Sequence, residues 1–415
     1  MKKVAVIQFP GTNSEYETRR ALREAQIDGK FFRWNQDPKE LDSFDGFVLC
    51  GGFAYEDRGR AGLIASMDSI MVEIRNQAAK GKPVLGICNG AQALVETGLI
   101  PGGADGALLM CLARNKRVRA GELLGTGFYN EDVYIKCEAP QRTAFTLDYE
   151  TTTAPELVPV AHGEGRFTTT IPTLFDKLRE NSQIVFRYCD QIGTVDSDFP
   201  VNPNGATDNA AAICNPSGNV MAIMPHPERA FIIPMPKIFS SMRKYMEGAP
   251  LQNTKSPLEF TDNRPPLQNY KPSALQIFVE LKITDNEAQT IQNALNHKGF
   301  NVKLKRWIHY EISHNSSAAD VFAELAKSGE LWNSNKENAT TSIPKIPSAK
   351  YFLARDMEDS AGTSKTARLQ RHLGKDKIQN ISQGTFWQVE TDSDIEKILA
   401  TNIFDNHHAQ VLWEV

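Results

Sequence analysis

Short apolar runs alternate with segments of helical periodicity through the first 248 residues of the chain. A short apolar run between polar or glycine positions predicts a strand, and apolar residues three and four apart predict one face of a helix. The expected strands are 3–9, 47–50 and 84–87, and the expected helices are 15–25 and 66–80. This alternation is typical of an α/β domain with a mainly parallel sheet, and residues 117–230 add a part richer in strands.

The pattern breaks between residues 249 and 273. This segment carries five prolines and no sustained period, so we interpret it as a linker. The chain is therefore expected to hold a first domain at 1–248 and a second domain at 274–415, joined by this linker.

The second domain alternates strands and helices in an order that runs twice. The first copy is expected to hold strands at 275–283 and 302–312 and helices at 287–298 and 318–331. The second is expected to hold strands at 351–355, 378–389 and 409–415 and helices at 364–373 and 394–400. The matched positions are Ile291 and Leu295 with Leu369 and Leu373, Gly299 with Gly374, and Trp307 with Trp387. We predict an α+β domain built as a tandem repeat, with a second polar linker at 333–349 and no clear closing strand in the first copy.

Composition serves mainly to exclude classes of protein. A chain of 415 residues suggests two or three domains at about 150 residues each, and 41% hydrophobic residues suffice for a sizeable core. A net charge of −4 lacks the basic footprint of nucleic-acid binders. No segment approaches the roughly 18 continuous apolar residues that span a membrane, and the run at 3–9 is too short for a signal peptide.

Cysteine and histidine usage excludes two further classes of protein. The six cysteines show no C-x-x-C pair and no disulfide-scaffold density, which favours a reducing cytoplasm. The eight histidines show no metal-ligand spacing apart from the adjacent His407 and His408, and two side chains do not make a site. We expect no metal and no cofactor in this chain.

Candidate chemistry begins at Cys88, within KPVLGICNGAQALVE (82–96). An apolar strand leads into the cysteine, a helical pattern follows it, and Gly86 and Gly90 lie two residues away on each side. A nucleophile at such a tight strand-to-helix turn is exposed and faces the positive end of the following helix, as in G-x-S-x-G hydrolases. The alternative is that Cys88 is one more buried small side chain, the usual place of a free cysteine.

A second candidate element is Met224-Pro225-His226-Pro227-Glu228-Arg229. Proline at 227 favours an extended conformation at His226, and residues two apart in an extended segment point to one side. His226 and Glu228 are thus expected to face one cavity as a general base and the carboxylate that orients it. A lone histidine is more often structural, but an elbow cysteine and this string in one α/β domain favour catalysis.

These residues carry a resemblance to a known family. The pattern G-x-C-x-G-x-Q at Gly86, Cys88, Gly90 and Gln92, followed by H-P-E, resembles the class I (triad) glutamine amidotransferases, whose domain is flavodoxin-like. Further stretches are similar to the glutaminase subunits of phosphoribosylformylglycinamidine synthase: FPGTN (9–13), GGFAYEDRGRAG (51–62), AHGEGRF (161–167), NPNGATDNAAAICN (202–215) and MPHPERAF (224–231). The second domain resembles, more loosely, two copies of the small bridging subunit of the same enzyme.

The resemblance implies a role for each matched residue. Cys88 would attack the side-chain carboxamide of glutamine, with His226 moving the proton and Glu228 orienting the ring. Backbone N–H groups at Gly52 and Asn89 would form the oxyanion hole. Gln92 and Gly51 would contact the substrate, although a glycine pair can be a simple turn and a helix glutamine can be a solvated surface residue.

Two charged stretches have both a functional and a non-functional interpretation. The G-x-G of HGEGRF could bring His162, Glu164 and Arg166 toward a substrate or partner, or form a turn with incidental charges. Tyr55, Asp57 and Arg60 after Gly52 could shape the glutamine pocket or a partner contact, or form a solvent-facing charged loop.

The chain contains no G-x-x-x-x-G-K-[ST] phosphate loop. The resemblance therefore implies a partner, an ATP-dependent synthetase subunit that holds ATP and Mg and uses the ammonia in de novo purine synthesis. The alternatives are a non-catalytic assembly adaptor, a class I glutaminase serving a different synthetase, and a cysteine hydrolase that does not use glutamine.

Overall fold

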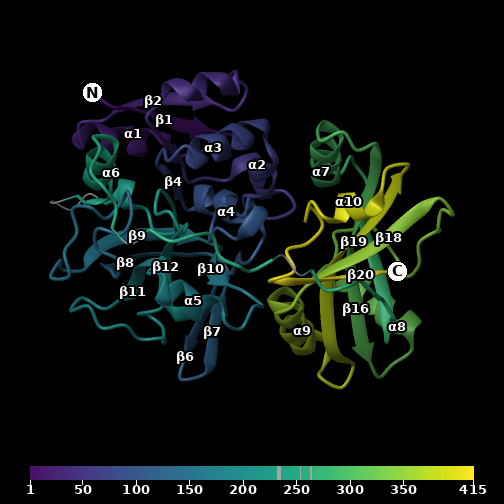
Figure 1. Ribbon diagram of the computed structural model, residues 1–415. Helices are drawn as coiled ribbons and strands as arrows, with labels where there is room; N and C mark the ends of the chain where they lie inside the picture. The colour runs from purple at the N-terminus through teal and green to yellow at the C-terminus, as the bar shows by residue number, and fades with distance from the viewer. Residues whose placement is uncertain (231–234, 253, 262–263) are drawn as a thin grey trace. The chain divides into compact units, whose positions relative to one another are not determined.

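The computed structural model describes residues 1–230, 235–252, 254–261 and 264–415 (Figure 1). The chain separates into two compact units, Met1–Asn263 and Arg264–Val415. Phe231, which ends the MPHPERAF stretch, and residues 253, 262 and 263 of the expected linker lie outside the described residues.

The first unit is built on a nine-stranded sheet in the order β2-β1-β3-β4-β13-β12-β11-β8-β9. Its strands are β1 (Lys3–Gln8), β2 (Asp28–Arg33), β3 (Gly46–Leu49), β4 (Val84–Ile87), β8 (Tyr129–Cys137), β9 (Glu156–His162), β11 (Ile184–Cys189), β12 (Ala210–Cys214) and β13 (Val220–Ile223). Strands β2, β1, β3, β4 and β13 are parallel in the 2-1-3-4-5 order of flavodoxin-like folds. The expected α/β domain with a mainly parallel sheet is confirmed, and strands β12, β11, β8 and β9 continue it in antiparallel fashion.

Helices and two small two-stranded sheets complete this unit. The helices are α1 (Glu15–Glu24), α2 (Leu63–Met67), α3 (Ser69–Ala79), α4 (Asn89–Glu96), α5 (Leu174–Glu180) and α6 (Ile238–Met246). β5 (Cys111–Arg114) pairs with β10 (Glu164–Thr168), and β6 (Lys116–Arg119) pairs with β7 (Glu122–Thr126).

Two details of this unit differ from the sequence prediction. The expected helix 66–80 is interrupted at Asp68, whose extended backbone ends α2 and whose side chain accepts the N–H of Ile70 to begin α3. Strand β2 was not predicted, because DGKFFR buries only Gly29 and Phe32 at the sheet edge and shows no regular alternation.

The second unit is a seven-stranded sheet in the order β14-β20-β18-β19-β16-β15-β17. Its elements are β14 (Gln268–Asn269), β15 (Leu275–Leu281), α7 (Asn286–His297), β16 (Val302–His314), α8 (Ala318–Ser328), β17 (Glu337–Thr340), β18 (Ala349–Asp356), α9 (Ser360–Leu373), β19 (Ile378–Thr391), α10 (Ile395–Leu399) and β20 (Gln410–Glu414). The order strand-helix-strand-helix-strand occurs twice, from β15 to β17 and from β18 to β20. The two halves meet at the antiparallel pair of β16 and β19, and the strand order outward from that pair is the same on both sides.

The matched glycines of the two halves both have positive φ. Gly299 follows α7 with φ of 90°, and Gly374 follows α9 with φ of 95°, in the left-handed region that favours glycine at helix ends. The expected polar linker at 333–349 is wrong in part, because it contains β17, which pairs with β15 and closes the first half. The ENAT sequence of this edge strand has no apolar alternation by which it could be recognised.

The sheet of the second unit has two different faces. One packs against α8 and α9 through a core that includes Tyr310, Ile312 and Leu369. The other carries an aromatic cluster of Phe278, Trp307, Tyr351, Leu353 and Phe386, against which the partly buried Tyr270, Ile343 and Trp413 pack.

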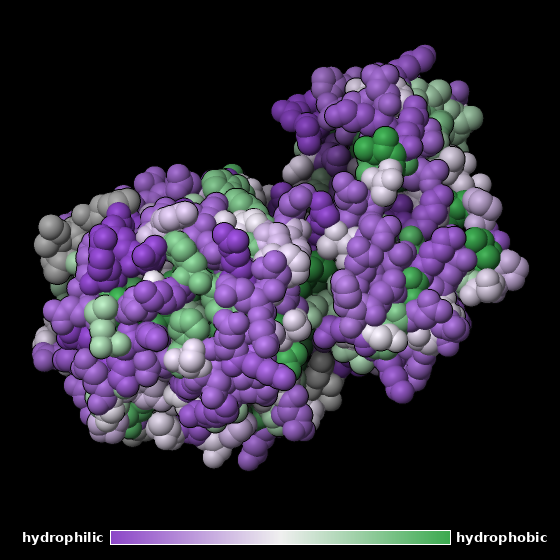
Figure 2. All heavy atoms as spheres, turned by 90° about the horizontal axis from the view of Figure 1, so that it is seen from above, coloured by the Kyte–Doolittle hydropathy of each residue, from purple (hydrophilic) through white to green (hydrophobic). Residues whose placement is uncertain are grey.

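The segment expected as a linker is not free of contacts at either end. Leu258 is buried and forms an isolated bridge with Gly103 in the first unit, whereas β14 pairs with β20 in the second. The face of the molecule in Figure 2 is largely hydrophilic, with hydrophobic side chains in scattered spots. Among the described residues, no helix is long and apolar enough to cross a membrane.

Candidate active site

The elbow at Cys88 has the strained backbone of a tight strand-to-helix turn, but the Cys88 side chain is buried, at 5% exposure, and not exposed as expected. Cys88 joins β4 to α4 with φ of 50° and ψ of −105°, and it is one of the few residues other than glycine with positive φ. Such a conformation costs about 1–3 kcal/mol, so surrounding contacts must hold it. The Cys88 N–H donates to Ile223 O at 2.8 Å, and the Cys88 carbonyl accepts from Gln92 N at 3.0 Å.

The glycines on each side of Cys88 are sterically required. A Cβ at Gly86 would lie 2.6 Å from Gly90 O, and a Cβ at Gly90 would lie 2.1 Å from Leu49 O. The helix therefore packs against β3 and β4 at a distance that no larger residue allows. This spacing explains why the G-x-C-x-G pattern is recognisable in the sequence.

His226 and Glu228 follow β13, the strand beside β4. His226 Nδ1 lies 2.7 Å from Glu228 Oε1, and both side chains are buried. The pairing does not come from an extended segment as expected. Instead, Pro227–Arg229 forms a 3-10 turn that brings the Glu228 carboxylate to the His226 ring. Glu228 Oε2 has no partner among the described residues, so the carboxylate makes its side-chain hydrogen bond to His226 alone.

The electrostatics of His226 follow from its two neighbours. Burial lowers the pKa of His226, but the charges of Glu228 and Cys88 and their hydrogen bonds to the ring outweigh burial and raise this pKa to about 10. The ring therefore keeps a proton at neutral pH beside the sulfur. This is the state from which it can protonate a leaving amine.

Gly51 and Gly52 follow β3, on the other side of β4. A Cβ at Gly51 would lie 2.7 Å from His226 Cε1, and the Gly51 N–H donates to Ser14 Oγ at 3.0 Å. Gly51 thus packs against the imidazole, and its expected contact with substrate stays a prediction.

Gly52 has the backbone of an oxyanion donor. Its φ is 140°, and a Cβ there would lie 2.6 Å from Gly11 O. Gly52 pairs with Thr12 through the flanking bonds Asn13 N to Gly51 O and Phe53 N to Gly11 O, which leaves the Gly52 N–H without an acceptor among the described residues. Asn89 opens α4, so its N–H is also one of the first-turn donors that a helix cannot satisfy.

The Asn89 side chain links the loop after Gly52 to the first turn of α4. Its Oδ1 accepts from Ala54 N at 2.9 Å, and its Nδ2 donates to Asp57 Oδ1 and Gln92 Oε1, each at 2.9 Å. Gln92 is buried and donates to Glu164 O at 2.6 Å, so the alternative of a solvated surface residue is wrong. Contact between Gln92 and substrate stays a prediction.

Side chains of the loop after Gly52 form hydrogen bonds and an ion pair with other parts of the first unit. Tyr55, Glu56 and Asp57 all have positive φ, the Tyr55 hydroxyl donates to Asp68 at 2.7 Å, and Arg60 forms a two-pronged pair with Glu96. Tyr55, Asp57 and Arg60 are half-buried whereas Phe53 and Glu56 are exposed, so the alternative of a solvent-facing charged loop is wrong only in part. Burial and the nearby Glu164 raise the pKa of Asp57 to about 7, although the Asn89 hydrogen bond opposes this shift.

The HGEGRF stretch forms a turn against the elbow. Ala161 O lies 3.9 Å from Cys88 Sγ, and the neighbouring His162 is buried. Burial and the charge of His226 lower the pKa of His162 to about 3, so the His162 ring is neutral at pH 7. The stretch does form a turn, in which His162 and Arg166 are both buried, and contact of its charged residues with a substrate or partner stays a prediction.

Three supporting residues were not identified from the sequence. Ser14 accepts the N–H of Gly51, and Asn115 and Asn204 bind the 161–165 turn from behind. Asn204 stands in the NPNGATDN stretch, which supported the resemblance but suggested no role. No local pattern marks Ser14 or Asn115. Within the described parts of the chain, no group of three or more potential metal ligands occurs.

The three parts of the site lie at the carboxyl ends of neighbouring parallel strands. Gly51 and Gly52 follow β3, Cys88 follows β4, and His226 follows β13. Ligands of open α/β sheets bind at this edge. A strained cysteine, a protonated imidazole and two open N–H groups are together equipped for acyl transfer through a thioester.

Comparison with known proteins identifies relatives of the first unit. A family model described as a CobB/CobQ-like glutamine amidotransferase domain matches residues 1–247. Phosphoribosylformylglycinamidine synthase subunit PurQ of Methanothrix thermoacetophila is 45% identical over 260 residues, 59% of this chain and 98% of that protein. The same subunit of Pyrococcus furiosus is 41% identical over 231 residues, 55% of this chain and 90% of that protein. The structure of PurLQS from Thermotoga maritima is 28% identical with a TM-score of 0.46, over 59% of this chain and 99% of that chain.

The chain belongs to the family of glutamine amidotransferases with a CobB/CobQ-like domain. Within that family, residues 1–247 form a glutamine amidotransferase domain of the PurQ type. The resemblance inferred from the elbow and the H-P-E string is thereby confirmed at the level of the family. The resemblance of the second domain to a bridging subunit stays a prediction.

Proposed function

We propose that this chain is the glutaminase component of phosphoribosylformylglycinamidine synthase in de novo purine synthesis, and that it hydrolyses glutamine to glutamate and ammonia. The observation that carries the proposal is the conjunction of a strained elbow at Cys88 with the buried His226–Glu228 pair at the ends of adjacent strands. The PurQ relatives are named as subunits of phosphoribosylformylglycinamidine synthase, which supports the choice of this enzyme.

The geometry suggests how the residues share the reaction. The Cys88 sulfur attacks the side-chain carbonyl carbon of glutamine, and the N–H groups of Gly52 and Asn89 stabilise the oxyanion. His226 gives its proton to the nitrogen as the C–N bond breaks, so that ammonia leaves and a γ-glutamyl thioester remains. His226 then takes a proton from water, which cleaves the thioester to glutamate and restores the thiolate.

The ammonia must be consumed by a second protein. We propose an ATP-dependent synthetase subunit as the partner, with ATP and Mg held there and no cofactor in this chain. Free ammonia at neutral pH would be protonated and lose its nucleophilicity, so transfer inside a docked complex is expected. We place the reaction in the cytoplasm, where a thiol nucleophile stays reduced.

The second unit is proposed as the bridging module of that complex. Its repeated topology, with two similar halves about the β16–β19 pair, is what two fused copies of one small subunit would produce. Its contribution is expected to be assembly, since the triad lies wholly within residues 88–228. Deleting residues 274–415 should weaken binding to the synthetase while leaving the glutaminase triad in place.

The test is glutamate release from glutamine by the wild type and by Cys88→Ala. Each is assayed alone and with the synthetase, ATP and formylglycinamide ribonucleotide. We expect release that requires Cys88 and increases with the full set, while ammonia-dependent synthesis by the complex survives the substitution. Release that ignores the nucleotide would point to another synthetase, and wild-type turnover in Cys88→Ala would end the triad assignment.

A further inference from the structure

Two buried asparagines hold the turn at residues 161–165 from the side away from Cys88. Asn115 lies between β5 and β6, and Asn204 lies in the NPNGATDN loop before β12. Both side chains are almost fully buried. Their carboxamides, unlike those of surface asparagines, are used in hydrogen bonds to the backbone of this turn.

Asn115 binds the turn at three points. Its Oδ1 accepts from Gly165 N at 2.9 Å, its Nδ2 donates to His162 O at 2.7 Å, and its backbone N–H donates to Gly163 O at 2.8 Å. A backbone N–H can only donate, so the Gly165 contact fixes which end of the amide is oxygen. The Nδ2 also donates to Gly127 O at 3.2 Å and lies 3.1 Å from His162 Nδ1.

Asn204 binds the turn from a second loop. Its Nδ2 donates to Gly165 O at 2.8 Å, its Oδ1 accepts from Ala206 N at 3.0 Å, and its carbonyl accepts from Lys116 N at 3.1 Å. Gly165 is therefore held by its N–H from one asparagine and by its carbonyl from the other.

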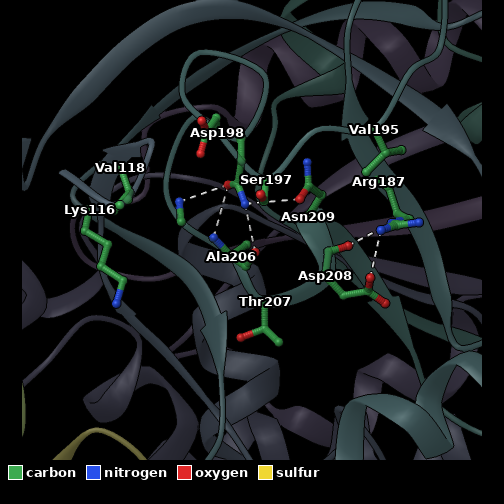
Figure 3. Close-up of a pocket in the computed structure, with 13 residues that line it drawn as sticks. Lys116, Val118, Arg187, Val195, Ser197, Asp198, Ala206, Thr207, Asp208 and Asn209 are labelled. Carbon is green, nitrogen blue, oxygen red and sulfur yellow. Dashed lines mark hydrogen bonds and ion pairs between the residues drawn. The ribbon is translucent and has the colours of Figure 1, made fainter. Parts of the chain in front are cut away.

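The loop that carries Asn204 is itself fixed. Asn202 Oδ1 accepts from Gly205 N at 2.9 Å and Ala206 N at 3.2 Å, and Asn202 Nδ2 donates to Ala206 O at 2.9 Å. The outer side of the loop lines a cavity of about 630 Å³, in which Arg187 pairs with Asp208 across from Lys116 (Figure 3). None of the triad residues lines this cavity, so the loop serves the active site through its inner side, at Asn204.

The front of the same turn forms one wall of the site. It places Ala161 O 3.9 Å from Cys88 Sγ and Glu164 O 2.6 Å from Gln92 Nε2. We propose that Asn115 and Asn204 are positioning residues that set the distance between this wall and the elbow, and thereby the fit of glutamine to Cys88. The inference deepens the proposed function and rests on it, because it assumes that the ligand between turn and elbow is glutamine.

The experiment compares two electrophiles on Cys88 in the full chain. Iodoacetamide is small and needs only the nucleophile, whereas a diazoketone analogue of glutamine must first fit between turn and elbow. In Asn204→Asp the donor to Gly165 O becomes a repelling oxygen at constant size. We expect the ratio of analogue to iodoacetamide labelling rates to fall about 10- to 100-fold, the cost of misplacing a substrate by roughly 1 Å. The KM for glutamine should rise in parallel in the presence of the synthetase.

Asn219→Asp is the matched control. Asn219 is equally buried and donates to Ala78 O at 2.8 Å and Lys82 O at 3.0 Å, at the opposite ends of β4 and β13 from the elbow. It should lose thermal stability without changing the labelling ratio. If Asn204→Asp does not fold, Asn115→Asp takes its place, since it keeps the acceptor for Gly165 N and loses the donors to the turn.

The outcomes are separable. A labelling ratio within twofold of wild type in a folded Asn204→Asp or Asn115→Asp would overturn the positioning role and leave these asparagines as structural residues. Failure of the glutamine analogue to label wild-type Cys88 at all, with iodoacetamide still reacting, would instead count against the proposed function.

Discussion

Both units contain a buried histidine with a glutamate two residues later, and the two pairs behave in opposite ways. In the first unit, His226 Nδ1 lies 2.7 Å from Glu228, and its pKa is raised to about 10. In the second, His309 and Glu311 lie on one face of β16, and burial together with Arg355 lowers the pKa of His309 to about 3. A His-x-Glu string therefore does not by itself define a catalytic pair.

The difference lies in what else binds each glutamate. Glu311 pairs with Arg355 at 2.9 Å and accepts hydrogen bonds from Tyr270 and from Ser273. Arg355 also approaches His309 Nδ1 at 3.1 Å, so the ring faces a cation rather than a carboxylate. Glu228 has no cation on its carboxylate among the described residues, and its side-chain hydrogen bond there goes to His226. The proposed catalytic carboxylate therefore differs from Glu311 in having no ion pair with a cation among the described residues.

The largest expected effect separates the two histidines by function. His226→Ala should lower glutamine turnover by about 10²–10⁴, the usual contribution of a positioned acid or base. His309→Ala should leave turnover per folded molecule unchanged, because its ring touches no part of the site. Steady-state glutamate release in the complex measures both. Equal losses in the two variants would show that the comparison is wrong.

The two glutamates should separate in the same way. Glu228→Gln removes the charge that opposes burial, so the pKa of His226 should fall from about 10 and turnover should fall by at least about 10-fold. Glu311→Gln leaves Arg355 without its carboxylate and should cost about 3 kcal/mol of unfolding free energy with little change in turnover. An NMR titration of the His226 ring and chemical denaturation measure the two effects.

A smaller effect tests the packing around His226. Gly51→Ala would place a Cβ 2.7 Å from His226 Cε1, so the ring must shift and turnover should fall by about 10-fold. Gly46→Ala, at the other end of β3, meets Met242 Cε and Pro83 Cγ at 2.9 Å. It should lower the melting temperature and spare turnover. Full turnover in Gly51→Ala would mean that the ring has room to move.

The smallest effect is on stability as a function of pH. His309 has a depressed pKa of about 3, so the unfolded chain binds its proton first and stability is lost as pH falls from 6.5 toward 3. Between pH 7 and 5 the loss of unfolding free energy amounts to about 2 kcal/mol. His309→Gln should abolish this part of the pH dependence of stability. His226 has the opposite sign, since its contribution is complete below pH 6.5 and is lost as pH rises through about 10. Denaturation curves at several pH values distinguish them.

The sequence predicted those features whose causes are local. The glycines around Cys88 and the string at His226 are neighbours in the chain, and their steric and hydrogen-bonding consequences follow from that proximity. The bonds from Asn115 to Gly165 and from Asn204 to Gly165 span 50 and 39 residues, so no local pattern announces them. Strand β17 was missed for a related reason, since its polar residues pair with β15 through the backbone.

Two similar halves meet at β16 and β19 within one chain. This arrangement affects how the halves respond to dilution and how their sequences can diverge. Two separate subunits would part at low concentration, whereas halves joined covalently stay at a fixed effective concentration. A substitution also alters one half only, which two identical subunits do not allow. The ion pair between Glu311 of the first half and Arg355 of the second is such an asymmetric feature. The covalent link thus lets each half carry its own surface without losing its counterpart.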